Sequence, residues 1–207
     1  MDEKRATGGK VVRSTRATSR LSRYGSVMRP SPQEVASQLT SILRSPWPEG
    51  IDDGLPWLRS KGIATETAEE ASAEGSGRSW HMASMPIWGT SRAGWSTYDD
   101  RFADVFWFLW YDHGWDDVRD AAAELAQQIA DVHGAPEETT EETAGHGPSW
   151  WWRLNDHSIE IYAHNGAVRP EGFPAGPSVV QLHVDLRAVA EPREAEAREM
   201  NALPGAD

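Results

Sequence analysis

The first regular pattern of apolar and polar residues begins at residue 31. The segment SPQEVASQLTSILRS places four apolar residues at helical spacing on one face: Val35, Leu39, Ile42 and Leu43. Ser31 is a favourable N-cap, Pro32 suits the first helical position, and Glu34 completes a capping box. The pattern predicts a helix that begins at residue 32 and ends before Pro46.

The clearest helical pattern lies in the segment GWDDVRDAAAELAQQIADVHGAP, residues 114–136. Its apolar stripe consists of Val118, Ala122, Leu125, Ile129 and Val132. Acidic residues occupy the first turn, where the helix dipole favours negative charge, and Gly134 followed by Pro136 ends the helix. We predict a helix over residues 115–133, with the charged form of His133 favoured in its last turn. A short helical turn is also expected in the segment LPWLRSKG.

Runs rich in aromatic and β-branched residues predict strands in the first half of the chain. WHMASMPIW, residues 80–88, is one such run, with Pro86 placed at an edge or a bulge. DVFWFLWY, residues 104–111, is apolar on both faces, which predicts a central strand. The segments between these helices and strands are predicted as a solvated helix or a loop at residues 64–79, a turn at 89–94, a short strand at 95–99 and an acidic loop at 137–147.

Three consecutive tryptophans open the last group of strands, in the segment SWWWRLNDHSIEIYAHNG. A strand through this segment directs Trp150 and Trp152 to one face and Trp151 to the other. The strands predicted at residues 157–164 and 179–187 alternate in the same way. We therefore predict an antiparallel meander with one apolar and one polar face. Trp150 and Trp152 then belong to the core beneath the longer helix, and Trp151 lies on the polar face.

These elements together predict an α+β fold, in which one antiparallel sheet of about five strands has helices packed mainly on one face. A charged surface helix is expected at residues 191–203. Residues 1–30 show almost no apolar periodicity, so we predict a disordered basic tail followed by a single acidic α+β domain over residues 31–207. Alternatives for the tail are an arm for nucleic acid or a membrane, a transit peptide, or sequence upstream of a start at Met28.

Charge divides the chain at the same place. Residues 1–30 hold eight basic and two acidic residues, a net charge of +6, and the whole chain carries −12, so residues 31–207 carry −18. An acidic body repels nucleic acid and favours basic partners, and we expect no membrane partner. The absence of cysteine excludes disulfides and thiolate metal sites. No apolar run reaches membrane-spanning length and no secretory signal is present, so we expect a cytoplasmic protein.

Residues that can carry chemistry gather on the polar face of the meander. His183 and Asp185 are two apart on one predicted strand, and pairing with the neighbouring strand brings Glu160 and His164 near them. Two histidines with carboxylates can bind Zn²⁺ or perform acid–base catalysis. Exposed cross-strand charge pairs explain the same residues without a ligand. The sequence contains no phosphate loop, nucleophile elbow or zinc-protease motif, and we expect no cofactor.

The eleven tryptophans allow two interpretations. Six of them could line a sugar- or peptide-binding groove by ring stacking: Trp80, Trp88, Trp95, Trp107, Trp110 and Trp151. Because tryptophan is buried on average, we favour a tryptophan-rich core with one or two exposed rings.

An acidic docking surface is the third candidate site. Its predicted residues are Trp151, Arg153, Tyr162, Glu137, Glu138, Glu141 and Glu142. Complementary charge raises the rate of encounter with a basic protein, and central aromatic residues prolong the complex. We therefore expect a non-enzymatic binding protein that holds a basic protein partner, as an inhibitor of a basic nuclease does. A metal-dependent domain and a sugar- or peptide-binding module are the alternatives.

The segment DVFWFLWYDHGWDDVRDAAAELAQQIADVHGAP, followed by WWWRLNDHSIEIYAHNG, resembles a loose group of small actinobacterial proteins. This group includes uncharacterised families and immunity proteins of polymorphic toxin systems. The shared pattern is an aromatic strand, a helix that ends in Gly-x-Pro, and a Trp- and Arg-containing strand followed by another strand. It covers roughly residues 100–190. The resemblance implies a fold, and an immunity function as an expectation, but it assigns no site residues.

Overall fold

The computed structural model of the protein describes residues 28–63, 69–72, 78–84, 88, 91–143, 146–167, 175–192 and 195. Its elements are, in chain order, α1 (Pro32–Leu43), α2 (Ile51–Ser60), β1 (Glu69–Ser72), β2 (Arg78–Ser84), β3 (Arg92–Tyr98), β4 (Arg101–Leu109), α3 (Trp115–His133), β5 (Glu138–Thr140), β6 (Ser149–Arg153), β7 (His157–His164) and β8 (Val179–Leu186). Residues 187–192 form a short helical stretch after β8. Residues 1–27 of the predicted tail, Pro86, and most of the helix predicted at 191–203 lie outside the described residues.

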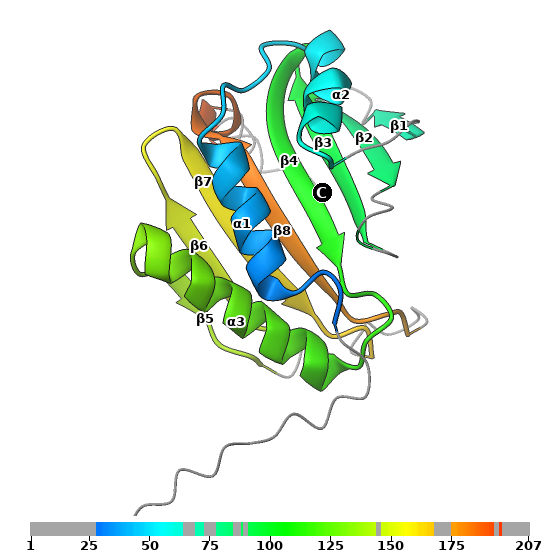
Figure 1. Cartoon of the computed structure of the whole chain (residues 1–207), viewed down its shortest axis with the longest axis vertical. Helices are drawn as coiled ribbons and strands as arrows, with labels where there is room; N and C mark the ends of the chain where they lie inside the picture. Colours follow the sequence, from blue (N-terminus) through cyan, green and yellow to red (C-terminus); the bar gives the residue numbers. More distant parts are fainter. Residues whose placement is uncertain are drawn as a thin grey trace, which may run out of the picture.

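One antiparallel sheet organises the molecule. Its strands follow the order β1-β2-β3-β4-β8-β7-β6-β5, so two meanders meet where β4 pairs with β8 (Figure 1). The aromatic strand β4 therefore lies in the middle of the sheet, as its two apolar faces predicted. The α+β fold with an antiparallel sheet is confirmed.

The predicted number of strands is wrong: the described residues form eight strands, and we expected about five. The additional strands β1 and β5 fall in the acidic segments that were predicted as a helix or loop and as a loop. Both lie at the edges of the sheet, and all three residues of β5 are exposed. An edge strand held by backbone hydrogen bonds, with both faces in water, needs no apolar alternation, so the residue pattern does not reveal it.

The turn predicted at residues 89–94 is also partly wrong, because β3 already begins at Arg92 and includes Gly94. Gly94 pairs with Phe106 of β4, and the Phe106 ring lies over the position that a Cβ atom would take. A glycine within a strand here marks a close approach of a neighbouring side chain and not a turn.

The predicted start of α1, with its capping box, is confirmed. The Ser31 hydroxyl accepts a hydrogen bond from the Glu34 amide at 3.2 Å, and the Glu34 carboxylate accepts one from the Ser31 amide at 2.7 Å. The hydrogen bonds that the Ser31 amide and the Ser31 hydroxyl donate to this carboxylate hold the pKa of Glu34 below its usual value. Val35, Leu39 and Ile42 are buried, as their spacing predicted.

The helix α3 has the predicted bounds, and four residues of its predicted stripe are buried: Val118, Ala122, Leu125 and Ile129. Val132 was predicted to be buried as well, but 57% of it is exposed. The helical repeat of 3.6 residues places the next inward position between residues 132 and 133, and it is the half-buried His133 that continues the stripe.

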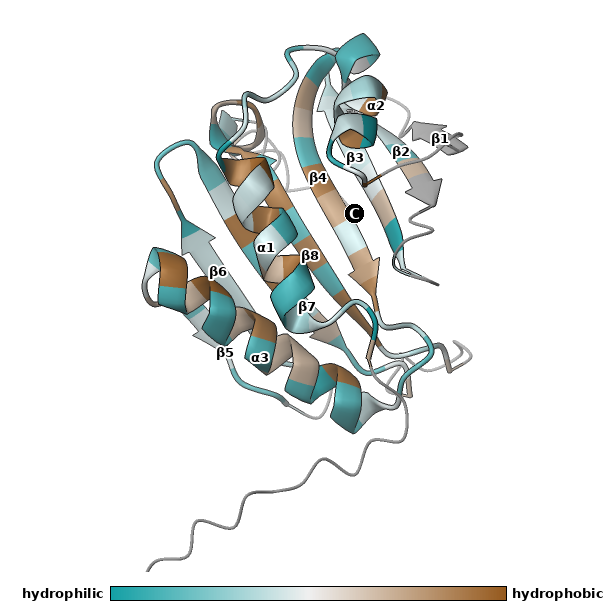
Figure 2. Cartoon of the chain, viewed as in Figure 1, coloured by the Kyte–Doolittle hydropathy of each residue, from teal (hydrophilic) through white to brown (hydrophobic). Residues whose placement is uncertain are grey.

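The helices α1, α2 and α3 cover the same side of the sheet (Figure 1). Apolar residues, brown in Figure 2, lie on α1 and α3 and on the strands beneath these helices. Four of the tryptophans considered for a ligand groove are buried in or beside this layer: Trp88, Trp95, Trp107 and Trp110. They cannot line a groove, so the core interpretation holds for them.

The consecutive tryptophans divide between the two sides of β6. Trp152 is only 2% exposed, and its indole N–H donates to the carbonyl of Gly134 at the end of α3. Trp150 is partly buried and packs against the same core. Trp151 lies on the opposite face. Within the described part of the chain, no helix is both long and apolar enough to cross a membrane.

Candidate functional site

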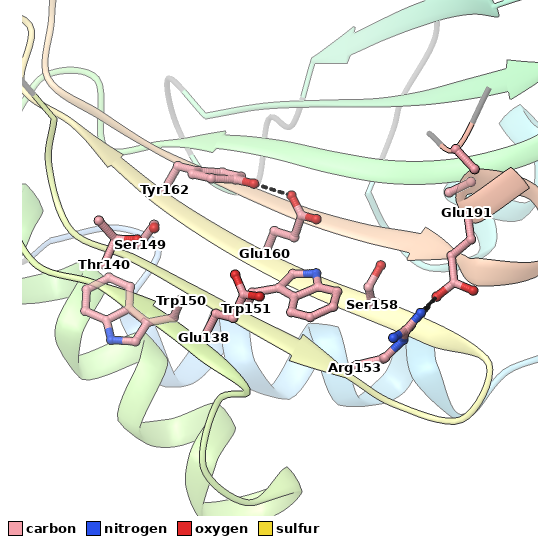
Figure 3. Close-up of a pocket in the computed structure, with 12 residues that line it drawn as sticks. Glu138, Thr140, Ser149, Trp150, Trp151, Arg153, Ser158, Glu160, Tyr162 and Glu191 are labelled. Atoms are coloured by element: carbon pink, nitrogen blue, oxygen red, sulfur yellow. Dashed lines mark hydrogen bonds and ion pairs between the residues drawn. The ribbon is translucent and has the colours of Figure 1, made fainter. Parts of the chain in front are cut away.

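A groove with a volume of about 550 Å³ lies on the face of the sheet away from the helices. We call it the Trp151 groove. It is lined by strands β5, β6 and β7 and by the chain after β8: Glu138, Thr140, Ser149, Trp150, Trp151, Arg153, Ser158, Glu160, Tyr162, Ala190, Glu191 and Ala195. In Figure 3 the helices α1 and α3 lie behind the sheet, and the lining side chains of β6 and β7, except Trp150, lie in front of it.

Strand register places Trp151 at the centre of this groove. Trp151 is the direct partner of Glu138 on β5 and of Glu160 on β7. Directly opposite residues on one face have Cβ atoms only ~4.5–5.5 Å apart. The indole, which is neither fully buried nor fully exposed, therefore stands between two carboxylate side chains (Figure 3).

Tyr162 extends the polar row on β7. Its hydroxyl donates to the Glu160 carboxylate at 2.5 Å, and 38% of the tyrosine is exposed. The hydroxyl is a neutral donor, so it orients the Glu160 carboxylate without cancelling its charge.

Arg153 forms the other wall of the groove together with Glu191. The Arg153 guanidinium donates to the Glu191 carboxylate at 2.5 and 3.1 Å, and it lies 5.8 Å from the ring centroid of Trp151. Glu191 also accepts from Arg187 at 2.7 Å. The hydrogen bonds from Arg187 and then from Arg153 lower the pKa of Glu191 to about 2.

Arg187 fastens the helical stretch to the sheet. Its Nη1 donates to the carbonyl oxygens of Leu154 at 2.7 Å and Asn155 at 2.8 Å, in the turn between β6 and β7. The wall that carries Glu191 is thereby fixed against the hairpin that carries Trp151 and Arg153.

The predicted docking residues are brought together only in part. Trp151, Arg153, Tyr162 and Glu138 line the groove, but Glu137, Glu141 and Glu142 do not. Glu137 and Glu141 are exposed beside it. Glu142 lies against α3, where its carboxylate accepts from the Trp115 indole at 3.0 Å and lies 3.8 Å from Arg119.

The predicted metal ligands share one face, but hydrogen bonds to other groups occupy them. The Gln181 amide lies between two of them: its oxygen accepts from His164 at 3.2 Å, and its nitrogen donates to His183 at 2.5 Å. His183 is the register partner of Glu160 and stacks on Phe106. In the described residues, no three histidine or carboxylate side chains converge as a metal site would require.

Asp185, the fourth predicted ligand, belongs to a different row. It accepts from Ser158 at 3.4 Å and lies directly opposite Asp104, which is 1% exposed and accepts from Ser96. Asp104 begins the run predicted as a strand with two apolar faces, so its buried carboxyl group was not predicted from the sequence.

Two histidines on the helix side have pKa values below the usual 6.5 because burial disfavours the charged ring. His133 contradicts the prediction from its helix position, since desolvation, helped by the charge of Arg44, outweighs the helix dipole. The His157 ring packs 4.8 Å from the Trp47 ring, and its buried Nε2 has no hydrogen-bond partner.

Glu191 is the charged groove residue that was not predicted from the sequence, and Thr140, Ser149 and Ser158 were not predicted either. The position of Glu191 four residues after Arg187 is the spacing of an ion pair on a helix, which could have been recognised from the sequence. Its contact with Arg153, 38 residues earlier, could not, because no short sequence pattern links the two residues. The chain matches no protein-family model, no curated protein and no solved structure. The resemblance to actinobacterial immunity proteins thus stays a prediction.

Proposed function

We propose that this protein is a non-catalytic binding protein that docks a basic protein partner on the Trp151 groove. The observation that carries the proposal is a central, partly exposed indole with a carboxylate on each neighbouring strand. Aromatic residues at the centre of an interface commonly supply much of its affinity, and a charged surround steers the encounter.

The charge of the molecule supports a basic partner. Residues 31–207 carry −18, and the exposed residues Glu137 and Glu141 lie next to the lining residues of β5 along the chain. A field of this sign accelerates association with a cationic surface and repels nucleic acid. Covering a cationic active site is one direct way to inhibit a basic enzyme, which is the immunity or inhibitor role, acting in the cytoplasm, that we propose.

The test uses the full chain as bait in a lysate of the organism that makes it, at low and at high salt. The variant Trp151→Ala is compared with Val132→Ala, which also truncates an exposed apolar side chain but on the opposite side of the molecule. We expect one basic protein in stoichiometric amount that is released at high salt and lost with Trp151→Ala alone. Retention of no protein at either salt concentration would overturn the proposal.

A carbohydrate is the second candidate ligand, because the groove combines the Trp151 ring with four hydroxyl side chains: Thr140, Ser149, Ser158 and Tyr162. Sugars present apolar faces to indole rings and hydroxyl groups to polar neighbours. A thermal-shift screen of neutral oligosaccharides tests it. A rise in Tm that disappears in Trp151→Ala would favour the sugar, and no rise with any of them would eliminate it.

A further inference from the structure

We propose that the Trp151 groove recognises one lysine or arginine side chain of its partner, held against the Trp151 ring between the carboxylates of Glu138 and Glu160. This inference rests on the proposed function and names the chemical group that the groove selects. We call Glu138, Trp151 and Glu160 the slot; they form one row across strands β5, β6 and β7.

The spacing of the row suits a cation. A charged nitrogen within ~6 Å of an indole centroid is attracted to the face of the ring. Glu138 and Glu160 each lie directly opposite Trp151, with Cβ atoms only ~4.5–5.5 Å from that of Trp151, so each carboxylate can approach a cation held against the ring. Figure 3 shows both carboxylates beside the Trp151 ring.

The chain itself contains an example of the same recognition. The Arg153 guanidinium lies 5.8 Å from the Trp151 centroid while it donates to the Glu191 carboxylate. A guanidinium, an indole and a carboxylate are thus already combined at one end of the groove. Glu138 and Glu160 place a carboxylate on each of the two strands that flank the Trp151 ring, where a guanidinium of the partner could bind in the same way.

The charge of the described lining favours a cation over an anion. The described lining contains three carboxylates and one guanidinium, which is a net charge of −2. Glu191 is already shared by Arg153 and Arg187. Phosphate and other anions would meet like charge in the slot.

The probe is a short arginine peptide, and its control is the same peptide with citrulline in place of arginine, which keeps the shape and removes the charge. Binding to the full chain is measured by calorimetry and by the shift of the Trp151 indole N–H signal in NMR spectra, assigned with Trp151→Phe. We expect the arginine peptide to bind and to move this signal, and the citrulline peptide to bind at least about fivefold more weakly.

Three variants locate the binding. Glu160→Gln and Glu138→Gln should each weaken the arginine peptide by up to about fivefold. Glu137→Gln removes the same charge from the adjacent exposed residue outside the groove and should change affinity by less than about twofold. The Gln variants keep an oxygen acceptor at each position, and thermal melting confirms that they remain folded.

The outcomes separate the inference from the proposed function. Equal losses for Glu137→Gln and Glu160→Gln, or equal binding of both peptides, would overturn the slot and leave only general attraction by charge. A captured protein that depends on Trp151, together with no binding of the arginine peptide, would overturn the slot while the proposed function stands. If neither the peptide nor a protein binds, both fail.

Discussion

Replacing Gly94 with alanine should lower the stability of the fold if Gly94 is packed as the structure describes, whereas ordinary strand propensity predicts that the same replacement raises it. Alanine at a strand glycine reduces the freedom of the unfolded chain and would stabilise the fold by ~0.4–1 kcal/mol where the site has room. Gly94 has no such room. A Cβ atom there would lie 2.6 Å from the carbonyl oxygen of His81 and closer still to Cζ of Phe106.

The magnitude follows from these two obstacles. Non-bonded carbon contacts are most favourable at ~3.5–4.0 Å, so the new atom overlaps a backbone oxygen and an aromatic ring by about 1 Å. The Phe106 ring can shift, but the His81 carbonyl belongs to the paired strand β2 and cannot rotate away. Overpacking of this kind typically lowers stability by ~1–3 kcal/mol, and each kcal/mol lowers the Tm of a chain of this size by about 2–4 °C.

Urea unfolding followed by tryptophan fluorescence measures the effect in a double-mutant cycle of Gly94→Ala with Phe106→Leu. The alanine should be less destabilising when Phe106 is leucine, because one of its two obstacles is smaller. Gly114→Ala is the control, since nothing lies within 4 Å of its Cβ, and as an N-cap change it should lower stability by less than about 1 kcal/mol. Unchanged or increased stability of Gly94→Ala would refute the reasoning.

Two further predictions concern titration. The folded-state pKa values of His157 and His133 lie below 6.5, so the native state binds fewer protons than the unfolded state. Their contribution to stability is therefore present above pH 6.5 and is lost as the pH falls below it. The urea midpoint should drop between about pH 7.5 and pH 5.5, the range in which histidine titrates, and should drop less steeply in His157→Phe; an equal drop in that variant would show that His157 does not contribute. Arg153→Gln should raise the pKa of Glu191 from about 2 by removing one of its two guanidinium donors, as followed by carboxyl-carbon NMR; an unchanged pKa would show that Arg187 alone sets it.

The candidate site illustrates how far local pattern reaches. Alternation along β6 and β7 placed Trp151, Arg153, Glu160 and Tyr162 on one polar face, and they do line one groove. Alternation could not show that Glu138 would join them, because β5 is an acidic edge strand with no apolar residue to mark it. Nor could it show that Gln181 would stand between His164 and His183, since that depends on the register of β7 with β8.

The sequence by itself determined the elements whose own residues bury a stripe or a face. Helices α1 and α3, the central strand β4 and the two-faced meander follow from apolar spacing, capping residues and the drive to remove those faces from water. Only the tertiary structure decided the edge strands, the close packing of Gly94 against Phe106, and the contact of Glu191 with Arg153. Each of these depends on backbone pairing or side-chain contact between different segments of the chain, and such interactions leave no periodic pattern in the residues that make them.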